Sequence, residues 1–238
     1  MADAKEDKVP DVTVLIPTIN EEDGIGHVID TIPMDAGLTI EVIVIDTDSK
    51  DRTKEIARSK GARVINESRR GYGRAYKTGF ENAKGDIIVT LDADCTYPAE
   101  EIPRLVKMLR DEDLDFITCD RLTRAEKGAM SRKHRFGNWA LSAAMNMLFR
   151  TGFKDSQSGM WVFKRAILTK IELESDGMPL SEEIKIEAKL CKLKRKEVPI
   201  VYRPRKGEVK LQSWADGKKN LKFLFHKKFG RKKPAKGS

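Results

Sequence analysis

Short apolar runs rich in β-branched residues recur along the chain, and amphipathic stretches lie between them. Apolar runs of about 4–8 residues are typical of strands buried on both faces of a parallel sheet, and the stretches between them are typical of crossover helices. The expected strands are Val12–Thr18, Ile40–Asp46, 62–66, 86–92 and 116–120. This alternation predicts an α/β fold with a mostly parallel sheet flanked by helices.

Three helices are expected between these strands. The first follows residue 20 and carries four apolar side chains at helical spacing, namely Ile25, Val28, Ile29 and Ile32. The second covers residues 51–60 and ends before Gly61, and a third begins near Pro98. With three helices between successive strands, a sheet of consecutive β-α-β units follows.

Polar side chains end or directly follow the first, second and fourth expected strands. They are Asn20, Glu21, Asp46, Asp48, Asp92 and Asp94. The carboxyl ends of parallel strands meet at one edge of a sheet, where ligands of doubly wound folds bind. Turn and cap residues of this kind are common singly, but three such sites together predict a functional cleft.

Asp92 and Asp94 lie two residues apart at the end of a strand. Paired carboxylates of this kind can hold Mg²⁺ or Mn²⁺ and leave positions open for substrate phosphates. A metal held there stabilises negative charge on a departing diphosphate. The pair is therefore the candidate metal site.

Other nucleotide-binding classes fit less well. The glycine-rich turn of a dinucleotide oxidoreductase should follow the first strand, where residues 17–21 read Pro-Thr-Ile-Asn-Glu. A phosphate-binding G-x-x-x-x-G-K-[ST] loop does not occur, and Gly71-Tyr72-Gly73 is interpreted as, at best, a loop near phosphates. The three histidines have no metal-ligand spacing, and the three cysteines form no C-x-x-C pair. This cysteine pattern supports neither a disulfide framework nor a zinc site, and favours a reducing compartment.

The net charge of +9 is concentrated at the C-terminal end. Residues 203–238 contain 13 of the 46 Lys and Arg but two of the 37 Asp and Glu, so the preceding part is close to neutral. Residues 1–10 are charged and are not expected to be a signal peptide. The predicted organisation is a flexible N-terminus over residues 1–10, a catalytic domain over 11–211 and a basic amphipathic tail over 212–238.

The tail has the pattern of a helix that lies on an anionic bilayer. Its apolar residues fall on one side and lysines largely fill the rest, the apolar set being Trp214, Leu221, Leu224, Phe225 and Phe229. A nucleic-acid arm is the weaker alternative, because an apolar stripe is not needed to face phosphates. An apolar segment at residues 140–149 is too short to span a membrane, and Trp139, Ala143 and Met147 are interpreted as a core stripe.

Five ordered motifs lie between residues 12 and 211. They are Pro-Thr-Ile-Asn-Glu-Glu at 17–22, Ile-Asp-Thr-Asp-Ser-Lys-Asp-Arg-Thr at 45–53, Leu-Asp-Ala-Asp at 91–94, Asp-Ser-Gln-Ser-Gly-Met at 155–160 and Arg-Lys-Gly-Glu-Val-Lys-Leu at 205–211. Together they resemble the motifs of the family-2 inverting glycosyltransferases of GT-A fold, and among them the dolichyl-phosphate mannose or glucose synthases. Thr47, Thr96 and Val209 depart from the usual family pattern.

The resemblance implies a role for each motif. Base, ribose and diphosphate contacts are expected from Pro17, Glu21, Asp46, Asp48, Asp92, Arg132, Arg135, Arg205 and Lys210, and metal ligation from Asp92 and Asp94. Asp94, Asp155 and Arg121 are the expected catalytic residues. The implied activity is transfer of a hexose from GDP-mannose, UDP-glucose or UDP-N-acetylglucosamine to dolichyl or polyprenyl phosphate, with Mg²⁺ or Mn²⁺ as cofactor.

A phosphate acceptor is ionised near neutral pH, with a second pKa of about 6, and so requires cations more than a general base. Arg121, Arg124, Arg132, Lys133 and Arg135 supply such cations. The expected enzyme is cytoplasmic, bound to the anionic membrane face and without a specific nucleic-acid partner.

Two alternatives remain. The first is a glycosyltransferase of the same fold with a saccharide hydroxyl acceptor and Glu183 as base; Glu182, Glu183 and Glu187 also suit the start of a helix. The second is a non-enzymatic protein that binds membranes or nucleic acid.

Overall fold

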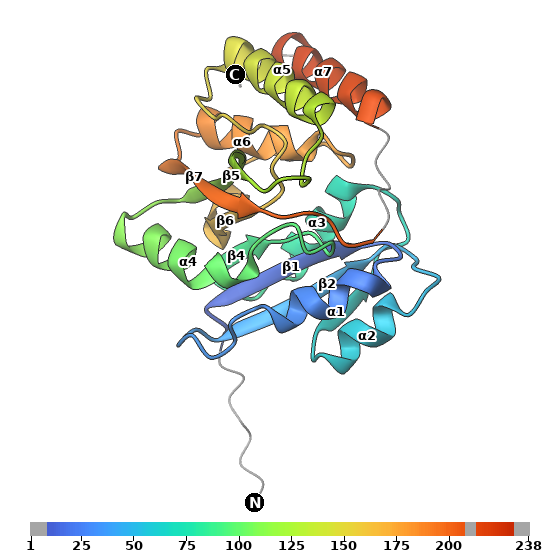
Figure 1. Ribbon diagram of the computed structural model, residues 1–238. Helices are drawn as coiled ribbons and strands as arrows, with labels where there is room; N and C mark the ends of the chain where they lie inside the picture. Colours follow the sequence, from blue (N-terminus) through green and yellow to red (C-terminus); the bar gives the residue numbers. More distant parts are fainter. Residues whose placement is uncertain (1–8, 208–212, 231–238) are drawn as a thin grey trace, which may run out of the picture.

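The computed structural model describes residues 9–207 and 213–230, and its centre is a seven-stranded sheet (Figure 1). The strand order is β3-β2-β1-β4-β6-β5-β7. The strands are β1 (Val12–Thr18), β2 (Ile40–Asp46), β3 (Arg63–Asn66), β4 (Ile87–Thr90), β5 (Phe116–Ala125), β6 (Trp161–Lys164) and β7 (Arg195–Tyr202). All five expected strands are present, and the mostly parallel sheet is confirmed.

The central strand β1 pairs in parallel with β2 and β4. Six of its seven residues are buried, in agreement with a strand covered on both faces. Its end at Thr18 lies opposite Asp46, the last residue of β2. The polar residues that follow β1, β2 and β4 therefore leave the sheet at the same edge.

Strands β6 and β7 were not expected from the sequence. The short strand β6 lies antiparallel between β4 and β5, and β7 pairs in parallel with β5. β5 also extends past residue 120 to Ala125, because its outer part pairs with β7 after a register shift between Asp120 and Arg124. These pairings join segments far apart in the chain, which local periodicity does not report.

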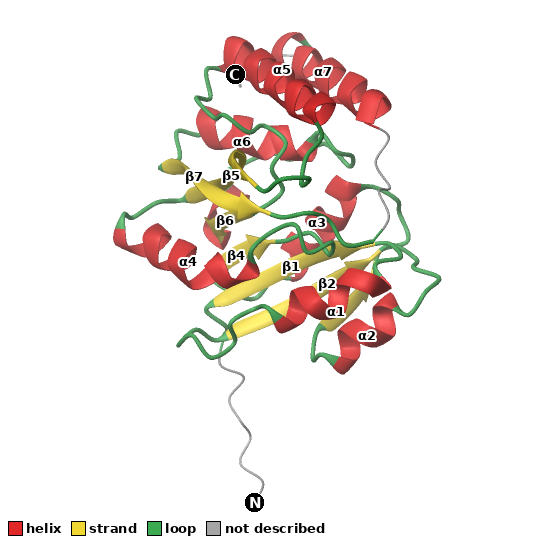
Figure 2. Ribbon diagram, in the orientation of Figure 1, coloured by secondary structure: helices red, strands yellow, loops and turns green. Residues whose placement is uncertain are grey.

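The helices are α1 (Glu22–Asp30), α2 (Thr53–Ser59), α3 (Tyr72–Asn82), α4 (Ile102–Asp111), α5 (Arg132–Phe149), α6 (Leu180–Leu190) and α7 (Ser213–Phe229), with short 3-10 turns at Ala99–Glu101 and Arg165–Thr169. They form the layers seen in Figure 2. One core cluster holds apolar residues of α1, α2 and α4, and the other holds residues of α3, α5, α6 and α7. The sheet thus separates two apolar cores, as in layered α/β folds.

Helix α7 packs along α5 (Figure 1). Leu224 is fully buried and Phe223 packs against the same core cluster, whereas Leu221, Phe225 and Phe229 are exposed. The expected apolar stripe is therefore divided between the core and the surface. The side chain of Trp214 and residues 231–238 lie outside the described part of the chain.

The interpretation of Trp139, Ala143 and Met147 as a core stripe is wrong, because all three side chains are exposed. The buried positions of α5 are Ser142, Met145 and Phe149, which are offset from that stripe around the helix. Sequence periodicity located an apolar face but could not tell which face meets the core. Within residues 9–207 and 213–230, none of the helices is both long and apolar enough to cross a bilayer.

Candidate active site at the carboxyl edge of the sheet

Asp46 organises the loop after β2. It is fully buried and accepts hydrogen bonds from Thr18 Oγ1 at 3.0 Å and from the amide and hydroxyl of Ser49 at 2.9 and 2.5 Å. Lys54 Nζ lies 3.8 Å from the same carboxylate. Asp46 therefore holds the ends of β1 and β2 together, and its two carboxylate oxygens already have protein partners.

The neighbouring loops approach each other through residues in the left-handed backbone region. Asn20 and Asp48 have φ angles of 51° and 52°. Lys50 N donates to Asn20 Oδ1 at 2.7 Å, and Asn66 Nδ2 donates to Asp48 Oδ1 at 3.1 Å. Asn and Asp tolerate this conformation better than other side chains. Together with Pro17, half-buried in β1, they form the side of the edge expected to hold the nucleotide.

Arg205 joins two acids that are distant in the sequence. Its Nη2 donates to Glu21 Oε1 at 2.9 Å, and its Nη1 lies 3.1 Å from Asp94 Oδ2. Asp94 Oδ1 accepts from the amide and hydroxyl of Thr96 at 3.1 and 2.6 Å. The convergence expected for Glu21, Asp94 and Arg205 is thus present. Lys210, which belongs to the same sequence motif, lies outside the described residues.

Asp92 differs from Asp94 in having no hydrogen bond to its carboxylate from residues 9–207 and 213–230. Burial and the nearby charge of Asp94 raise the pKa of Asp92 to about 7, against the effect of Arg121 and Arg205. A divalent cation would relieve this repulsion, and two carboxylates fit a metal whose other ligands are phosphate and water oxygens. Among the described residues there is no group of three or more His, Cys, Asp or Glu side chains that could hold a metal alone.

Arg121 and Asp155 form a buried bidentate ion pair. Arg121 Nε and Nη2 donate to the two oxygens of Asp155 at 2.8 and 2.9 Å, and the Arg121 amide donates to Oδ2 at 3.1 Å. Burial opposes ionisation, but the charge and hydrogen bonds of Arg121 hold the pKa of Asp155 below its usual value. The guanidinium carbon also lies 5.4 Å from the centre of the Tyr202 ring. The structure thus brings these two expected catalytic residues into direct contact.

The loop at residues 155–159 contacts several side chains that sequence reasoning missed. Tyr97 Oη accepts from the amide of Gly159 at 2.7 Å. A Cβ at Gly159 would overlap the Tyr72 hydroxyl and lie 3.6 Å from Asp92 Oδ1, so this loop approaches Asp92 closely. Tyr97 directly precedes Pro98, and its place three residues after Asp94 was the available signal.

Lys185 lies under the same loop. Its ammonium donates to the carbonyl oxygens of Ser156, Ser158 and Ser181 at 2.8–3.0 Å. Burial lowers the pKa of Lys185 to about 7. Three carbonyl acceptors use all three protons of the ammonium, so Lys185 fixes the loop backbone to α6.

Glu182 and Glu183 on α6 are both fully buried but have different partners. Glu183 accepts from the amide of Ser175 at 2.8 Å and from Lys227 Nζ at 2.7 Å. Glu182 Oε1 accepts from Gln157 Nε2 at 2.7 Å, whereas its Oε2 is buried and has no hydrogen bond within the described part of the chain. Burial raises the pKa of Glu182 to about 8. A base role for Glu183 is disfavoured, because Lys227 already neutralises it.

Arg132 and Arg135 lie on the exposed first turn of α5. Arg135 Nη2 donates to the carbonyl of Leu122 at 3.1 Å, one residue from Arg121. The structure therefore places Arg121 in the interior and the other two arginines on the surface, with Arg135 in contact with the residue that follows Arg121. Their assignment as phosphate ligands stays a prediction.

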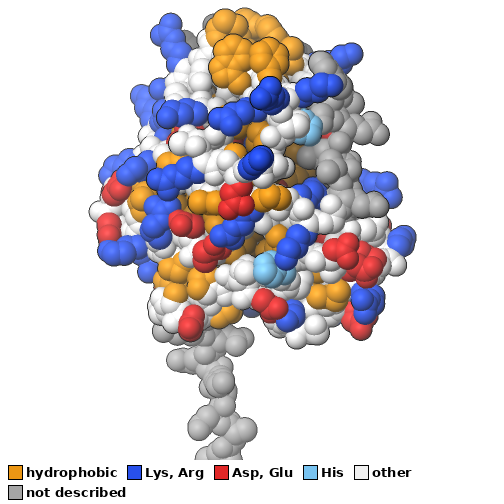
Figure 3. Space-filling model, in the orientation of Figure 1, with side chains coloured by type: hydrophobic (Ala, Val, Ile, Leu, Met, Phe, Trp, Pro, Cys, Tyr) orange, Lys and Arg blue, Asp and Glu red, His pale blue; other side chains and the backbone are white. Residues whose placement is uncertain are grey.

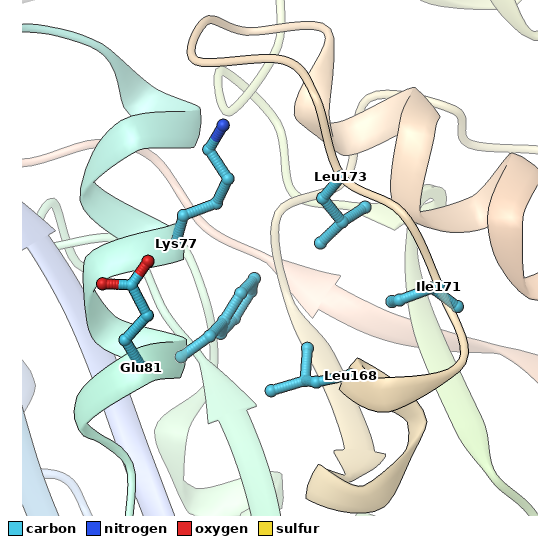
Figure 4. Close-up of a pocket in the computed structure, with 6 residues that line it drawn as sticks. Lys77, Glu81, Leu168, Ile171 and Leu173 are labelled. Carbon is cyan, nitrogen blue, oxygen red and sulfur yellow. The ribbon is translucent and has the colours of Figure 1, made fainter.

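Gly71 and Gly73 pack against the loop at residues 175–177, and their interpretation as a loop near phosphates stays a prediction. A Cβ on either residue would overlap backbone carbonyl oxygens of residues 175–177, and Gly71 has φ of 151°. These glycines allow the start of α3 to pack against that loop. A cavity of about 280 Å³ lies between α3 and the segment after β6 (Figure 4). The residues that line it include Lys77, Glu81, Leu168, Ile171 and Leu173. None of these belongs to the sheet edge described above.

Comparison with known proteins identifies related sequences. Residues 13–172 match the model of glycosyl transferase family 2. The chain is 36% identical over 207 residues to a dolichyl-phosphate hexose transferase of Haloferax volcanii, covering 87% of this chain and 89% of the relative. It is 40% identical over 226 residues to the low-salt glycan biosynthesis hexosyltransferase Agl6 of the same organism, covering 93% of this chain but 54% of the relative.

Two further comparisons concern a more distant enzyme and the fold. The chain is 30% identical to a dolichol-phosphate mannosyltransferase of Pyrococcus furiosus, covering 90% of this chain and 62% of that protein. A crystal structure of glucosyl-3-phosphoglycerate synthase from Mycobacterium tuberculosis, in complex with Mn²⁺, UDP and glucosyl-3-phosphoglycerate, superimposes with a TM-score of 0.74 at 22% identity. It covers 96% of this chain and 82% of that chain, and the expected GT-A fold is confirmed.

Proposed function

Because the chain belongs to glycosyl transferase family 2, we propose that it transfers a hexose from a nucleoside-diphosphate sugar to a polyprenyl phosphate of the dolichyl type. The observation that carries this proposal is the convergence of Glu21, Asp92 and Asp94 with two arginines at the carboxyl edge of the sheet. Similarity to a dolichyl-phosphate hexose transferase over most of both chains supports the acceptor class. A non-enzymatic binding protein is the poorer interpretation, given this family.

In the proposed step, an oxygen of the acceptor phosphate forms a bond to the anomeric carbon of the sugar. The bond from that carbon to the diphosphate breaks, and its electron pair leaves with the diphosphate. Attack from the opposite face inverts the configuration. The acceptor oxygen is already ionised near neutral pH, so the step requires no general base. The ion pair between Glu183 and Lys227 agrees with an acceptor that needs no base from this position.

Asp92 and Asp94 would hold Mg²⁺ or Mn²⁺, which when bound neutralises charge on the departing diphosphate. Arg205, at 3.1 Å from Asp94, adds a fixed positive charge beside the same phosphates. Arg121 uses Nε and Nη2 on Asp155, while its Nη1 makes no hydrogen bond within residues 9–207 and 213–230. We assign that nitrogen to a phosphate oxygen. Pro17, Glu21, Asp46 and Asp48 are proposed to shape the pocket for base and ribose, and Asp155 to orient Arg121.

We also propose that the enzyme works at the cytoplasmic face of an anionic membrane, with residues 212–238 in contact with it. The acceptor class supports this location, because a polyprenyl chain remains in the bilayer. A specific nucleic-acid partner is not proposed.

The test is transfer of label from GDP-mannose, UDP-glucose and UDP-N-acetylglucosamine to a polyprenyl phosphate, with Mg²⁺ or Mn²⁺. We expect labelled lipid from one of the three donors. In Asp94→Asn the rate of transfer should fall on the order of 10²–10³-fold, the usual effect of removing one group that stabilises charge in a transition state. Asn at this position can still accept the Thr96 hydrogen bonds, so the loop should remain folded.

Asp35→Asn is the matched control, because Asp35 is exposed and distant from the sheet edge. Full activity of a folded Asp94→Asn variant would refute the metal assignment. Nucleotide-sugar binding without lipid product would instead refute the polyprenyl phosphate acceptor.

A further inference from the structure

Two aromatic pairs are exposed on α5 and α7. Phe136 and Trp139 are 68% and 60% exposed, with ring centres 5.7 Å apart. Phe225 and Phe229 are also exposed, with ring centres 6.2 Å apart. Exposed aromatic side chains that cluster in this way are typical of an interaction site. Figure 3 shows hydrophobic side chains gathered at the top of the molecule, where Figure 1 places α5 and α7.

The two helices form one surface, which we call the α5–α7 platform (Arg132–Phe149 and Ser213–Phe229). They pack side by side, and their inner faces share a core cluster through Met145, Phe149 and Leu224. Lys228 Nζ on α7 lies 5.5 Å from the centre of the Phe149 ring on α5. The exposed faces of both helices are therefore held in one fixed arrangement.

The charge of the platform is almost entirely positive. Asp216 is the one acidic residue in the sequences of the two helices. The exposed basic residues are Arg132, Lys133, Arg135, Arg150 (at the end of α5), Lys218, Lys219, Lys222 and Lys228. Aromatic side chains surrounded by Lys and Arg match the headgroup region of an anionic bilayer, where aromatic rings and basic side chains both bind. A protein partner would more commonly meet a surface with fewer lysines.

The platform also contacts the loop that carries Asp155. From α5, Ser142 Oγ accepts from the amide of Ser156 at 2.9 Å. From α7, Asn220 Nδ2 donates to Gln157 Oε1 at 2.7 Å. The platform is therefore joined through its inner face to the loop that carries Asp155, a residue of the proposed site.

We infer that the α5–α7 platform docks on an anionic lipid bilayer, and that α5 contributes as much to docking as the C-terminal helix does. The inference rests on the proposed function, because a polyprenyl phosphate acceptor would lie in the same bilayer. It assigns Phe136 and Trp139 to the membrane surface, a role that the C-terminal tail alone does not include.

The experiment measures co-sedimentation of the full chain with vesicles of phosphatidylcholine and phosphatidylglycerol, and with phosphatidylcholine alone. Two double variants are compared with wild type: Phe136→Ser with Trp139→Ser on α5, and Phe225→Ser with Phe229→Ser on α7. Met34→Ser is the matched control, because Met34 is exposed but lies outside both helices. Circular dichroism confirms that each variant is folded.

We expect binding to the anionic vesicles and at least tenfold weaker affinity in each double variant, with Met34→Ser unchanged. Unchanged binding of the folded α5 variant would overturn the inference. So would equal binding to both vesicle types, or a self-associated wild type that both double variants convert to monomer without an effect on vesicle binding.

Transfer to a short-chain, water-soluble polyprenyl phosphate separates this inference from the proposed function. The double variants should retain that activity, because none of the four residues lies in the site. Loss of vesicle binding together with soluble transfer supports both claims. If the wild type binds vesicles but transfers no sugar under any condition, the proposed function is refuted and the docking surface is retained. If it transfers sugar to the soluble acceptor but does not bind vesicles, the docking surface is refuted and the proposed function is retained.

Discussion

Acidic side chains are arranged in opposite ways at the carboxyl edge of the sheet and beneath α7. At the edge, burial and the nearby charge of Asp94 raise the pKa of Asp92, and Arg205 pairs with Asp94. Beneath α7, Lys227 is within 2.7 and 2.9 Å of Glu183 and Glu187. Within the described residues, Arg205 is shared by Glu21 and Asp94 at the edge, whereas beneath α7 both glutamates contact one buried ammonium.

This difference distinguishes a ligand-binding site from a contact that stabilises the fold. A buried negative charge without a cation costs stability, so its persistence indicates a position that a ligand completes. A buried carboxylate that already has an ammonium partner contributes to the native structure instead. Hydrogen bonds to Glu183 and Glu187 raise the pKa of Lys227 although burial opposes this, as expected for such a contact.

The largest expected effect comes from removing the Lys227 ammonium. Lys227→Met takes this cation away from two buried carboxylates, Glu183 and Glu187, and we expect the free energy of unfolding to fall by about 3–5 kcal/mol. Urea unfolding followed by circular dichroism measures the change. Lys228→Met, at an exposed position in the same turn, should alter it by less than about 0.5 kcal/mol. Equal values for the two variants would mean that Lys227 has no structural role.

The next effect concerns Glu182, an acid of α6 that makes no ion pair within residues 9–207 and 213–230. Its pKa is about 8 in the folded chain and 4.5 for an ordinary Glu, so the folded state binds more protons between these values. Stability therefore decreases as the pH rises from about 4.5 to 8. Glu182→Gln keeps an acceptor for Gln157 and removes this loss. We expect its melting temperature to exceed that of wild type by roughly 4 °C or more at pH 8 and by little at pH 5. A difference independent of pH would argue against a protonated Glu182.

The smallest expected change in stability is at Asp92, whose side chain retains some contact with solvent. Its pKa is about 7 against an ordinary 3.8, so ionisation destabilises the folded chain as the pH rises through this range. In the presence of a chelator, Asp92→Asn should raise stability more at pH 8 than at pH 5. Because solvent screens this half-buried side chain, we expect a gain of about 1 kcal/mol, well below the full equivalent of the pKa shift. Adding Mg²⁺ or Mn²⁺ should stabilise wild type and not the variant. A metal response that is the same in both would remove Asp92 from the proposed metal site.

Local sequence patterns were sufficient for the first half of the fold. The strands β1, β2 and β4 were recognised because each is a short buried run, and the acids after them were placed at one edge because parallel strands end together. In contrast, β6 and β7 are defined by pairing with β5, and the exposed face of α5 depends on what α6 and α7 cover. Neither the pairing of β6 and β7 nor the exposed face of α5 can be predicted from the periodicity of apolar residues in the sequence.

The sequence by itself determined the residues that could form a site and the class of fold that would bring them to one edge. Tertiary structure decided which of those acids have a cation, because each partner comes from a distant segment. Arg205 meets Glu21 across 184 residues, Arg121 meets Asp155 across 34, and Lys227 meets Glu183 across 44. Burial and the distance between charges set both the pKa and the energetic effect of a carboxylate, and both quantities exist only once the chain has folded.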